Sequence, residues 1–209
     1  MRASTGLAVI GFVLAVVSGI EILTHGPLYH LDYRVALNFS PITASRSSDV
    51  ARFLASVGRP WIACTTVGGL AAVVAALTRR IGPAIAAAVG LAGIGAAVWL
   101  LKETFPRLSI AAQQPGSFPS GHTGVAVVAS GLAVYLVLPH VAWRERAAVL
   151  VAALWGAVMA WGRVVTDTHW LSDVLAGWGI GITVLVIALR SADSPLGKRG
   201  WARSAPADR

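Results

Sequence analysis

The sequence predicts an all-α integral membrane protein built as a bundle of six transmembrane helices. Hydrophobic residues make up 56% of the 209 residues, and the mean hydropathy is +0.71. Only 12% of the residues are charged, whereas about a quarter are charged in an ordinary soluble domain. The apolar residues also gather into runs close to the ~20 residues that a helix needs to cross a bilayer.

Six apolar runs are candidate spans, and they cover residues 6–23, 60–77, 83–101, 122–138, 147–165 and 170–189. Backbone polar groups in lipid must bond within their own segment, so we expect each run to be a helix. Only residues 78–82 join the second run to the third, which predicts a tight antiparallel hairpin. The Ala and Gly content of the runs allows close helix packing.

The first run follows Arg2 and resembles the first two regions of a secretory signal peptide. No small-x-small cleavage site follows it, and Glu21, Ile22 and Leu23 continue the segment, so we expect a retained first helix. Cys64 is the single cysteine and lies within an apolar run, which predicts a small buried side chain and excludes an internal disulfide.

The only long connection, residues 24–59, carries a further predicted helix over residues 39–57. Ser40-Pro41 supplies a start signal, and Val50, Phe53 and Val57 share a helical face, which indicates a helix lying along the membrane interface. Residues 191–209 are rich in Ser, Pro, Gly and Arg and predict a disordered cytoplasmic tail after one membrane domain, residues 1–190.

Lysine and arginine placement predicts the orientation of the bundle. Six spans put both termini on one side of the membrane, and that side receives ten of the 17 basic residues. The positive-inside rule therefore predicts cytoplasmic termini. The net charge of +8 forms no continuous stripe, so we expect contacts with anionic lipid and no nucleic-acid partner.

Ionisable residues cluster at the ends of the predicted spans in three groups, residues 102–107, 120–122 and 163–173. Following the chain through six spans places all three groups on the same, extracytoplasmic side. Ionisable residues within or beside spans are costly and usually functional. We therefore expect these groups to form one site.

The stretch GRVVTDTHWLSDV contains His169 and Asp173, which are four residues apart at the start of the last span and share a helix face. A carboxylate at one imidazole nitrogen fixes the tautomer and leaves the other nitrogen available as a nucleophile. Arg163 precedes them at the end of the fifth span. The alternative interpretation is an interfacial pair that only anchors the helix.

The stretch PSGH, which ends at His122, begins the fourth span. A helix N-terminus is a ready anion site, Gly121 permits close approach of the backbone, and Ser120 adds a hydroxyl donor. His122 can give a proton to a leaving oxygen. The alternative is a simple serine N-cap followed by a polar interfacial histidine.

Lys102 and Arg107 follow the third span in KETFPRLSI, and both residue types bind phosphate oxygens. Snorkelling at a membrane end is the alternative explanation. Taken together, the three groups contain the parts of a phosphoryl-transfer site that neutralises an anion without a metal. The sequence shows no carboxylate cluster for magnesium and too few partners for zinc, so we expect neither a metal nor a cofactor.

At these residues the chain resembles the type 2 phosphatidic acid phosphatase (PAP2) family, which includes vanadium haloperoxidases and bacterial polyprenyl-diphosphate phosphatases. The family motifs are K-x6-R-P, P-S-G-H and S-R-x5-H-x3-D. The second is complete, and the third is present with Gly162 in place of its serine. In the first, Ser109 and Ile110 replace Arg-Pro, and Arg107 stands two positions earlier, where many members carry an additional arginine.

The resemblance implies a nucleophilic His169 that forms a phosphohistidine, oriented by Asp173, with His122 as acid and then base. The implied phosphate-binding residues are Lys102, Arg107, Ser120, Gly121 and Arg163.

The resemblance further implies a lipid phosphatase, and the composition suggests a bacterial inner membrane. Substrates of this kind include phosphatidate, phosphatidylglycerophosphate and polyprenyl phosphates or diphosphates. A lipid phosphotransferase and a degenerate phosphate-lipid-binding protein stay open, whereas haloperoxidases are usually soluble.

Overall fold

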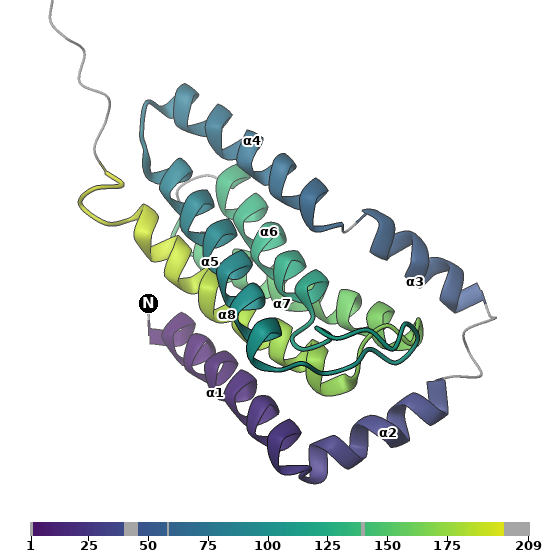
Figure 1. Ribbon diagram of the computed structural model, residues 1–209. Coiled ribbons are helices and arrows are strands. Elements are labelled where there is room, and N and C mark those ends of the chain that lie inside the picture. Colours follow the sequence, from purple (N-terminus) through teal and green to yellow (C-terminus); the bar gives the residue numbers. More distant parts are fainter. Residues whose placement is uncertain (1, 40–45, 58, 139–140, 199–209) are drawn as a thin grey trace, which may run out of the picture.

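The computed structural model describes residues 2–39, 46–57, 59–138 and 141–198 (Figure 1). This part of the chain folds into eight helices and contains no strand, which confirms the all-α prediction. The helices are α1 (Arg2–Thr24), α2 (Pro27–Phe39), α3 (Arg46–Val57), α4 (Pro60–Thr78), α5 (Gly82–Thr104), α6 (Gly121–Val137), α7 (Arg144–Val165) and α8 (Leu171–Ala192).

Five of these helices, α1, α4, α5, α7 and α8, are long and apolar enough to cross a membrane. The remaining predicted span, the fourth (residues 122–138), corresponds to α6, which has 17 residues and is therefore about 25 Å long, shorter than the roughly 30 Å hydrocarbon core. Helix α6 contacts α4, α5, α7 and α8. Because its neighbours surround it, this central helix is shielded from lipid along most of its length.

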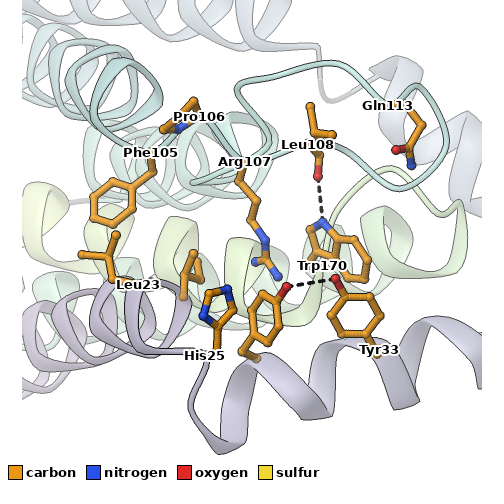
Figure 2. Close-up of a pocket in the computed structure, with 11 residues that line it drawn as sticks. Leu23, His25, Tyr33, Phe105, Pro106, Arg107, Leu108, Gln113 and Trp170 are labelled. Atoms are coloured by element: carbon orange, nitrogen blue, oxygen red, sulfur yellow. Dashed lines mark hydrogen bonds between the residues drawn. The ribbon is translucent and has the colours of Figure 1, made fainter.

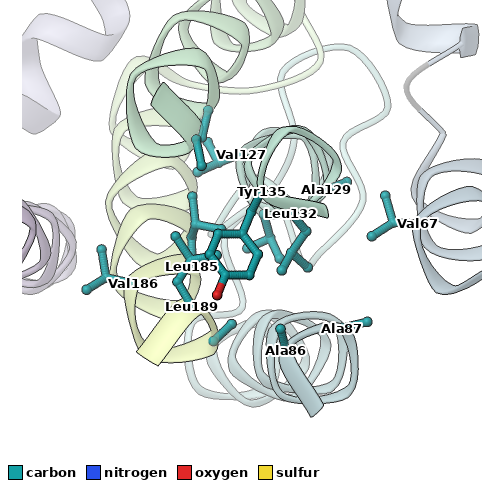
Figure 3. Close-up of a cluster of buried hydrophobic side chains, with 14 of the residues drawn as sticks. Val67, Ala86, Ala87, Val127, Ala129, Leu132, Tyr135, Leu185, Val186 and Leu189 are labelled. Carbon is teal, nitrogen blue, oxygen red and sulfur yellow. The ribbon is translucent and has the colours of Figure 1, made fainter. Parts of the chain in front are cut away.

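The hydrophobic core lies where α6 meets α5 and α8 (Figure 3). Leu132 of α6 packs among Leu185 and Leu189 of α8, and all three side chains are at most 1% exposed. Small residues such as Ala86 of α5 let the helix axes approach closely. The core thus forms a rigid scaffold that fixes the relative positions of the helix ends.

The predicted hairpin between the second and third spans is present as α4 and α5. Arg79 ends α4 in the left-handed conformation, with φ of 54°, and its N–H bonds the carbonyl of Ala75. Helix α5 then begins at Gly82 and carries a proline in its first turn. This short connection makes the two helices antiparallel neighbours.

Helix α1 packs along α8 (Figure 1). The Thr183 hydroxyl of α8 donates a hydrogen bond to the Ala8 carbonyl of α1 at 3.0 Å. Gly11 and Gly179 face each other so closely that a Cβ on either one would collide with the carbonyl oxygen of the other. The first predicted helix is therefore an integral part of the bundle.

The structure corrects the predicted bounds of the helix expected over residues 39–57. Phe39 ends α2, the described part of the following helix begins at Arg46, and the expected start at residues 40 and 41 lies outside the described residues. Helix α2 itself is not predicted from the sequence. It begins at Pro27, a residue favoured in a first helical turn, and the Glu21 carboxylate accepts a hydrogen bond from the Leu28 N–H at 2.8 Å.

The first residues of the predicted tail, from residue 191, are ordered in the structure. Helix α8 continues to Ala192, and a turn follows in which the Lys198 N–H donates to the Ser194 carbonyl at 3.0 Å. Residues 199–209 lie outside the described residues. The last span therefore extends slightly beyond the predicted domain boundary at residue 190.

Replacing Gly179 by alanine is expected to destabilise the protein by about 1–3 kcal/mol, because the added methyl group overpacks the contact between α1 and α8. Gly69→Ala in α4 is the matched control, since a Cβ there meets nothing within 4 Å. Thermal unfolding in detergent measures the stability of both variants. Equal stability of Gly179→Ala and the unsubstituted protein would contradict the close packing of α1 on α8.

Candidate active site

The three predicted groups of polar residues meet at one end of the bundle. Lys102 lies in the last turn of α5, His122 in the first turn of α6, and Arg163 in the last turn of α7. Two backbone hydrogen bonds join the connecting segments, from Ser120 N to Asp173 O at 2.9 Å and from Ala111 N to Asp167 O at 3.0 Å. The helix ends are thus tied together directly.

A pocket of about 630 Å³ opens between these helix ends. Its polar lining includes Lys102, His122, Arg163 and His169, so both predicted imidazoles and two predicted cations face one cavity. Gly121 also lines it, at the N-terminus of α6. The pocket therefore combines two histidines with positive charge and a helix N-terminus, which suits a tetrahedral anion.

One wall of the same pocket is apolar. Ile94, Val98 and Trp99 of α5 line it, together with Val125 of α6. Ile94 precedes Lys102 by eight residues, so this wall extends about 12 Å along α5 from the charged end. The pocket is consequently polar where the helices end and apolar where they enter the bundle.

His169 is held by Asp173, as the four-residue spacing predicts. His169 Nδ1 lies 3.4 Å from Asp173 Oδ2, and the two residues are 8% and 0% exposed. Burial lowers the pKa of His169, and the nearby charges of Arg163 and Lys102 act in the same direction, whereas the hydrogen bond to Asp173 opposes them. The environment therefore favours the neutral form of the His169 imidazole, and a neutral imidazole nitrogen is chemically capable of nucleophilic attack.

The carboxylate of Asp173 has several further partners. Its Oδ2 accepts hydrogen bonds from the Ser117 hydroxyl at 2.5 Å and from the Trp170 N–H at 3.1 Å. The Ser117 hydroxyl also lies 3.4 Å from His169 Nδ1. Ser117 is 3% exposed and lines the pocket, yet no motif assigns it a role. Its only sequence signal is its position immediately before the Phe-Pro-Ser-Gly-His stretch.

Ser120 takes a different place from the one expected. Its hydroxyl accepts hydrogen bonds from the N–H of Thr123 at 3.5 Å and from the Thr123 hydroxyl at 3.1 Å, so it caps α6. The residue is fully buried, and it is not among the residues that line the pocket. Ser120 thus fixes the start of α6, while the neighbouring Gly121 reaches the cavity.

Lys102 and Arg163 differ in how fully their polar atoms are bonded. Lys102 Nζ donates to the carbonyl of Gly116, which holds the lysine against the loop before α6. Within the described part of the chain, Arg163 Nε is buried and has no hydrogen-bond partner. A buried donor without a partner is costly. Arg163 therefore has an N–H group available for an anion in the pocket.

Among the described residues, no group of three or more His, Cys, Asp and Glu side chains is arranged to hold a metal ion. The buried carboxylate of Asp173 instead has arginine, serine, histidine and backbone N–H partners. Lys102 and Arg163 both contribute positive charge to the lining of the pocket.

Comparison with known proteins identifies the family. The model of the PAP2 superfamily matches residues 61–194. The chain belongs to the PAP2 superfamily. The lipid A 1-phosphatase of Porphyromonas gingivalis is 35% identical over 97 residues, which are 46% of this chain and 21% of that protein. The match therefore spans about a fifth of the length of that relative.

A solved structure shares the fold. The crystal structure of a transmembrane PAP2-type phosphatidylglycerolphosphate phosphatase from Bacillus subtilis matches with a TM-score of 0.69. The match covers 90% of this chain and 94% of that chain at 18% sequence identity. At 18% identity, this match shows that the two chains share the same arrangement of helices.

The first PAP2 motif departs from the family pattern, and the structure shows where its residues lie. Ser109, at the expected arginine position, lines the pocket. Arg107 does not replace that arginine, because its guanidinium is directed to Asp32 and Asp173 at 2.7 and 2.9 Å. Arg107 lines a different cavity (Figure 2). The expectation that Arg107 binds phosphate in the histidine-lined pocket is therefore corrected: both of its terminal nitrogens are already bound to carboxylates.

Replacing Arg163 by glutamine is expected to weaken binding of inorganic phosphate about 10- to 100-fold, because a hydrogen bond to a charged group contributes roughly 1.5–3 kcal/mol. Isothermal titration calorimetry on the purified protein measures the affinity. Arg34→Gln is the control, because it removes the same charge from an exposed position on α2. Equal affinities for the two variants would remove Arg163 from the anion site.

Proposed function

We propose that this protein is an integral membrane lipid phosphatase that hydrolyses a lipid phosphomonoester or diphosphate through a phosphohistidine intermediate. The observation that carries the proposal is the two-part pocket. Its charged end contains two imidazoles and two cations, and its apolar wall extends along α5 toward the membrane interior. A phosphorylated lipid has the same division between an anionic headgroup and an apolar chain.

The proposed first step is attack of His169 Nε2 on phosphorus. A bond forms between Nε2 and phosphorus as the bond to the leaving oxygen breaks, and His122 gives its proton to that oxygen. Asp173 holds Nδ1–H and stabilises the positive charge that develops on the ring. Lys102, Arg163 and the backbone N–H groups at the start of α6 would bind the phosphoryl oxygens.

The second step is hydrolysis of the phosphohistidine. His122, now unprotonated, accepts a proton from water as the water oxygen attacks phosphorus. The bond between phosphorus and Nε2 breaks, which returns His169 to its starting state and releases inorganic phosphate. Both steps use charges supplied by the chain itself, so we expect the reaction to proceed without a metal or cofactor.

The relatives support a lipid phosphate as the substrate. One is named a lipid A 1-phosphatase and another a phosphatidylglycerolphosphate phosphatase. The positive-inside distribution of lysine and arginine favours a site on the extracytoplasmic face with both termini in the cytoplasm. We therefore propose a bacterial inner membrane enzyme that acts on lipids of the outer leaflet.

The test is phosphate release by purified protein from a panel containing phosphatidate, phosphatidylglycerophosphate and polyprenyl phosphate and diphosphate, with EDTA present. We expect release from at least one lipid and a loss of at least about 1000-fold in His169→Ala, because that variant lacks the nucleophile. Circular dichroism and thermal unfolding establish that the variant is folded.

Four outcomes would contradict the proposal in different ways. Retained activity in His169→Ala would exclude the proposed nucleophile, and loss of activity with EDTA would show that a metal is required. Transfer of phosphate to a second lipid or sugar without release of inorganic phosphate would identify a phosphotransferase instead. Binding of phosphate without any turnover would identify a binding protein.

A further inference from the structure

We propose that Asp32 of α2 is a positioning residue for the His169–Asp173 pair and acts through Arg107 and Ser172. The inference rests on the proposed phosphatase function and adds a residue outside the PAP2 match, which begins at residue 61. Asp32 is 1% exposed although it lies on a helix that is not a candidate span. A carboxylate buried to this degree requires partners.

Both oxygens of the Asp32 carboxylate are bonded to residues next to the active site. Oδ1 accepts the Ser172 N–H at 2.8 Å, and Oδ2 accepts the Ser172 hydroxyl at 2.6 Å. Oδ2 also accepts from Arg107 Nη2 at 2.7 Å. Ser172 lies in the first turn of α8, where the positive end of the helix dipole favours a carboxylate. Asp32 is therefore fixed to the start of the helix that carries Asp173.

Arg107 connects the two carboxylates. Its Nη1 donates to Asp173 Oδ1 at 2.9 Å and approaches the Ser172 hydroxyl at 2.5 Å, while Nη2 is bound to Asp32. The rings of Trp170 and Tyr29 lie 4.9 and 5.8 Å from the guanidinium carbon. Figure 2 shows Trp170 beside Arg107. This aromatic cover leaves the Arg107 side chain only 9% exposed. The guanidinium consequently has one orientation, fixed by both carboxylates and by the rings.

This arrangement determines which oxygen of Asp173 faces the nucleophile. Arg107 binds Oδ1, so Oδ2 is left for His169, Ser117 and the Trp170 N–H. Without Asp32, both terminal nitrogens of Arg107 could turn to Asp173 and compete for Oδ2. The carboxylate would then rotate and release His169 Nδ1. Small displacements of a catalytic group from its reactive geometry cause large losses of rate.

The first measurement compares kcat and the inhibition constant of inorganic phosphate in the unsubstituted protein and in Asp32→Asn. We expect kcat to fall about 10- to 100-fold, a loss of the size that follows removal of groups that orient metal-binding side chains. The inhibition constant should change less than about threefold, because Asp32 lies outside the anion pocket. Asp49→Asn on the exposed face of α3 is the matched control.

A second variant covers the case in which Asp32→Asn does not fold. Ser172→Ala removes the hydroxyl that joins Asp32 to Arg107 but leaves no charge without a partner. It should lower kcat several-fold with the phosphate inhibition constant unchanged. Asp32→Glu should restore part of the activity, since it keeps the carboxylate. If Asp32→Asn and Ser172→Ala had the same kcat as the unsubstituted protein, the proposal would be overturned. A loss of phosphate binding as large as the loss of kcat would also overturn it.

Nitrogen-15 NMR of histidine-labelled protein separates this inference from the proposed function, because it requires no turnover. The chain has five histidines, and the spectrum of His169→Ala identifies the signal of interest. We expect a single tautomer protonated at Nδ1 in the unsubstituted protein and a mixture in Asp32→Asn. An unchanged tautomer would overturn positioning by Asp32, whereas absence of phosphate release from every lipid would overturn only the proposed function.

Discussion

The architecture depends on one buried carboxylate at the end of an apolar bundle. Asp173 is completely buried, and a charge in that position is tolerated only when each oxygen has partners. Those partners come from the segment between α5 and α6 and from the segment between α7 and α8. The requirement to satisfy this carboxylate therefore brings together loops that are far apart in the sequence, and the histidine pocket forms beside them.

The rest of the molecule supports this contact. Close packing among α5, α6 and α8 fixes the helix ends, and α1 reinforces α8 from the outside. The same packing gives the pocket an apolar wall that continues from its charged end. A bundle that is suited to a membrane thus presents polar chemistry at its end without exposing charges to lipid along its length. Helix α2 adds a second buried carboxylate, Asp32, behind the site.

Much of this arrangement can be predicted from the sequence because it follows from length and spacing. Apolar runs near the length of a bilayer predict the spans, and the four-residue interval from His169 to Asp173 predicts their contact. The contact between Arg107 and Asp32 could not be predicted from the sequence. The two residues are 75 positions apart, and Asp32 lies in a helix without a strong apolar pattern. Ser120 shows another limit, since one hydroxyl can cap a helix or bind a ligand, and only coordinates distinguish the two.

The central claim is that the contact with Asp173 makes His169 a nucleophile. Rapid alkaline quenching during turnover, followed by mass spectrometry of the digested protein, tests it most directly. The account predicts a phosphoryl group on His169 that appears before inorganic phosphate and is absent from Asp173→Ala. Full turnover with no phosphoryl group on His169 at any quench time, or with one on a different residue, would contradict it.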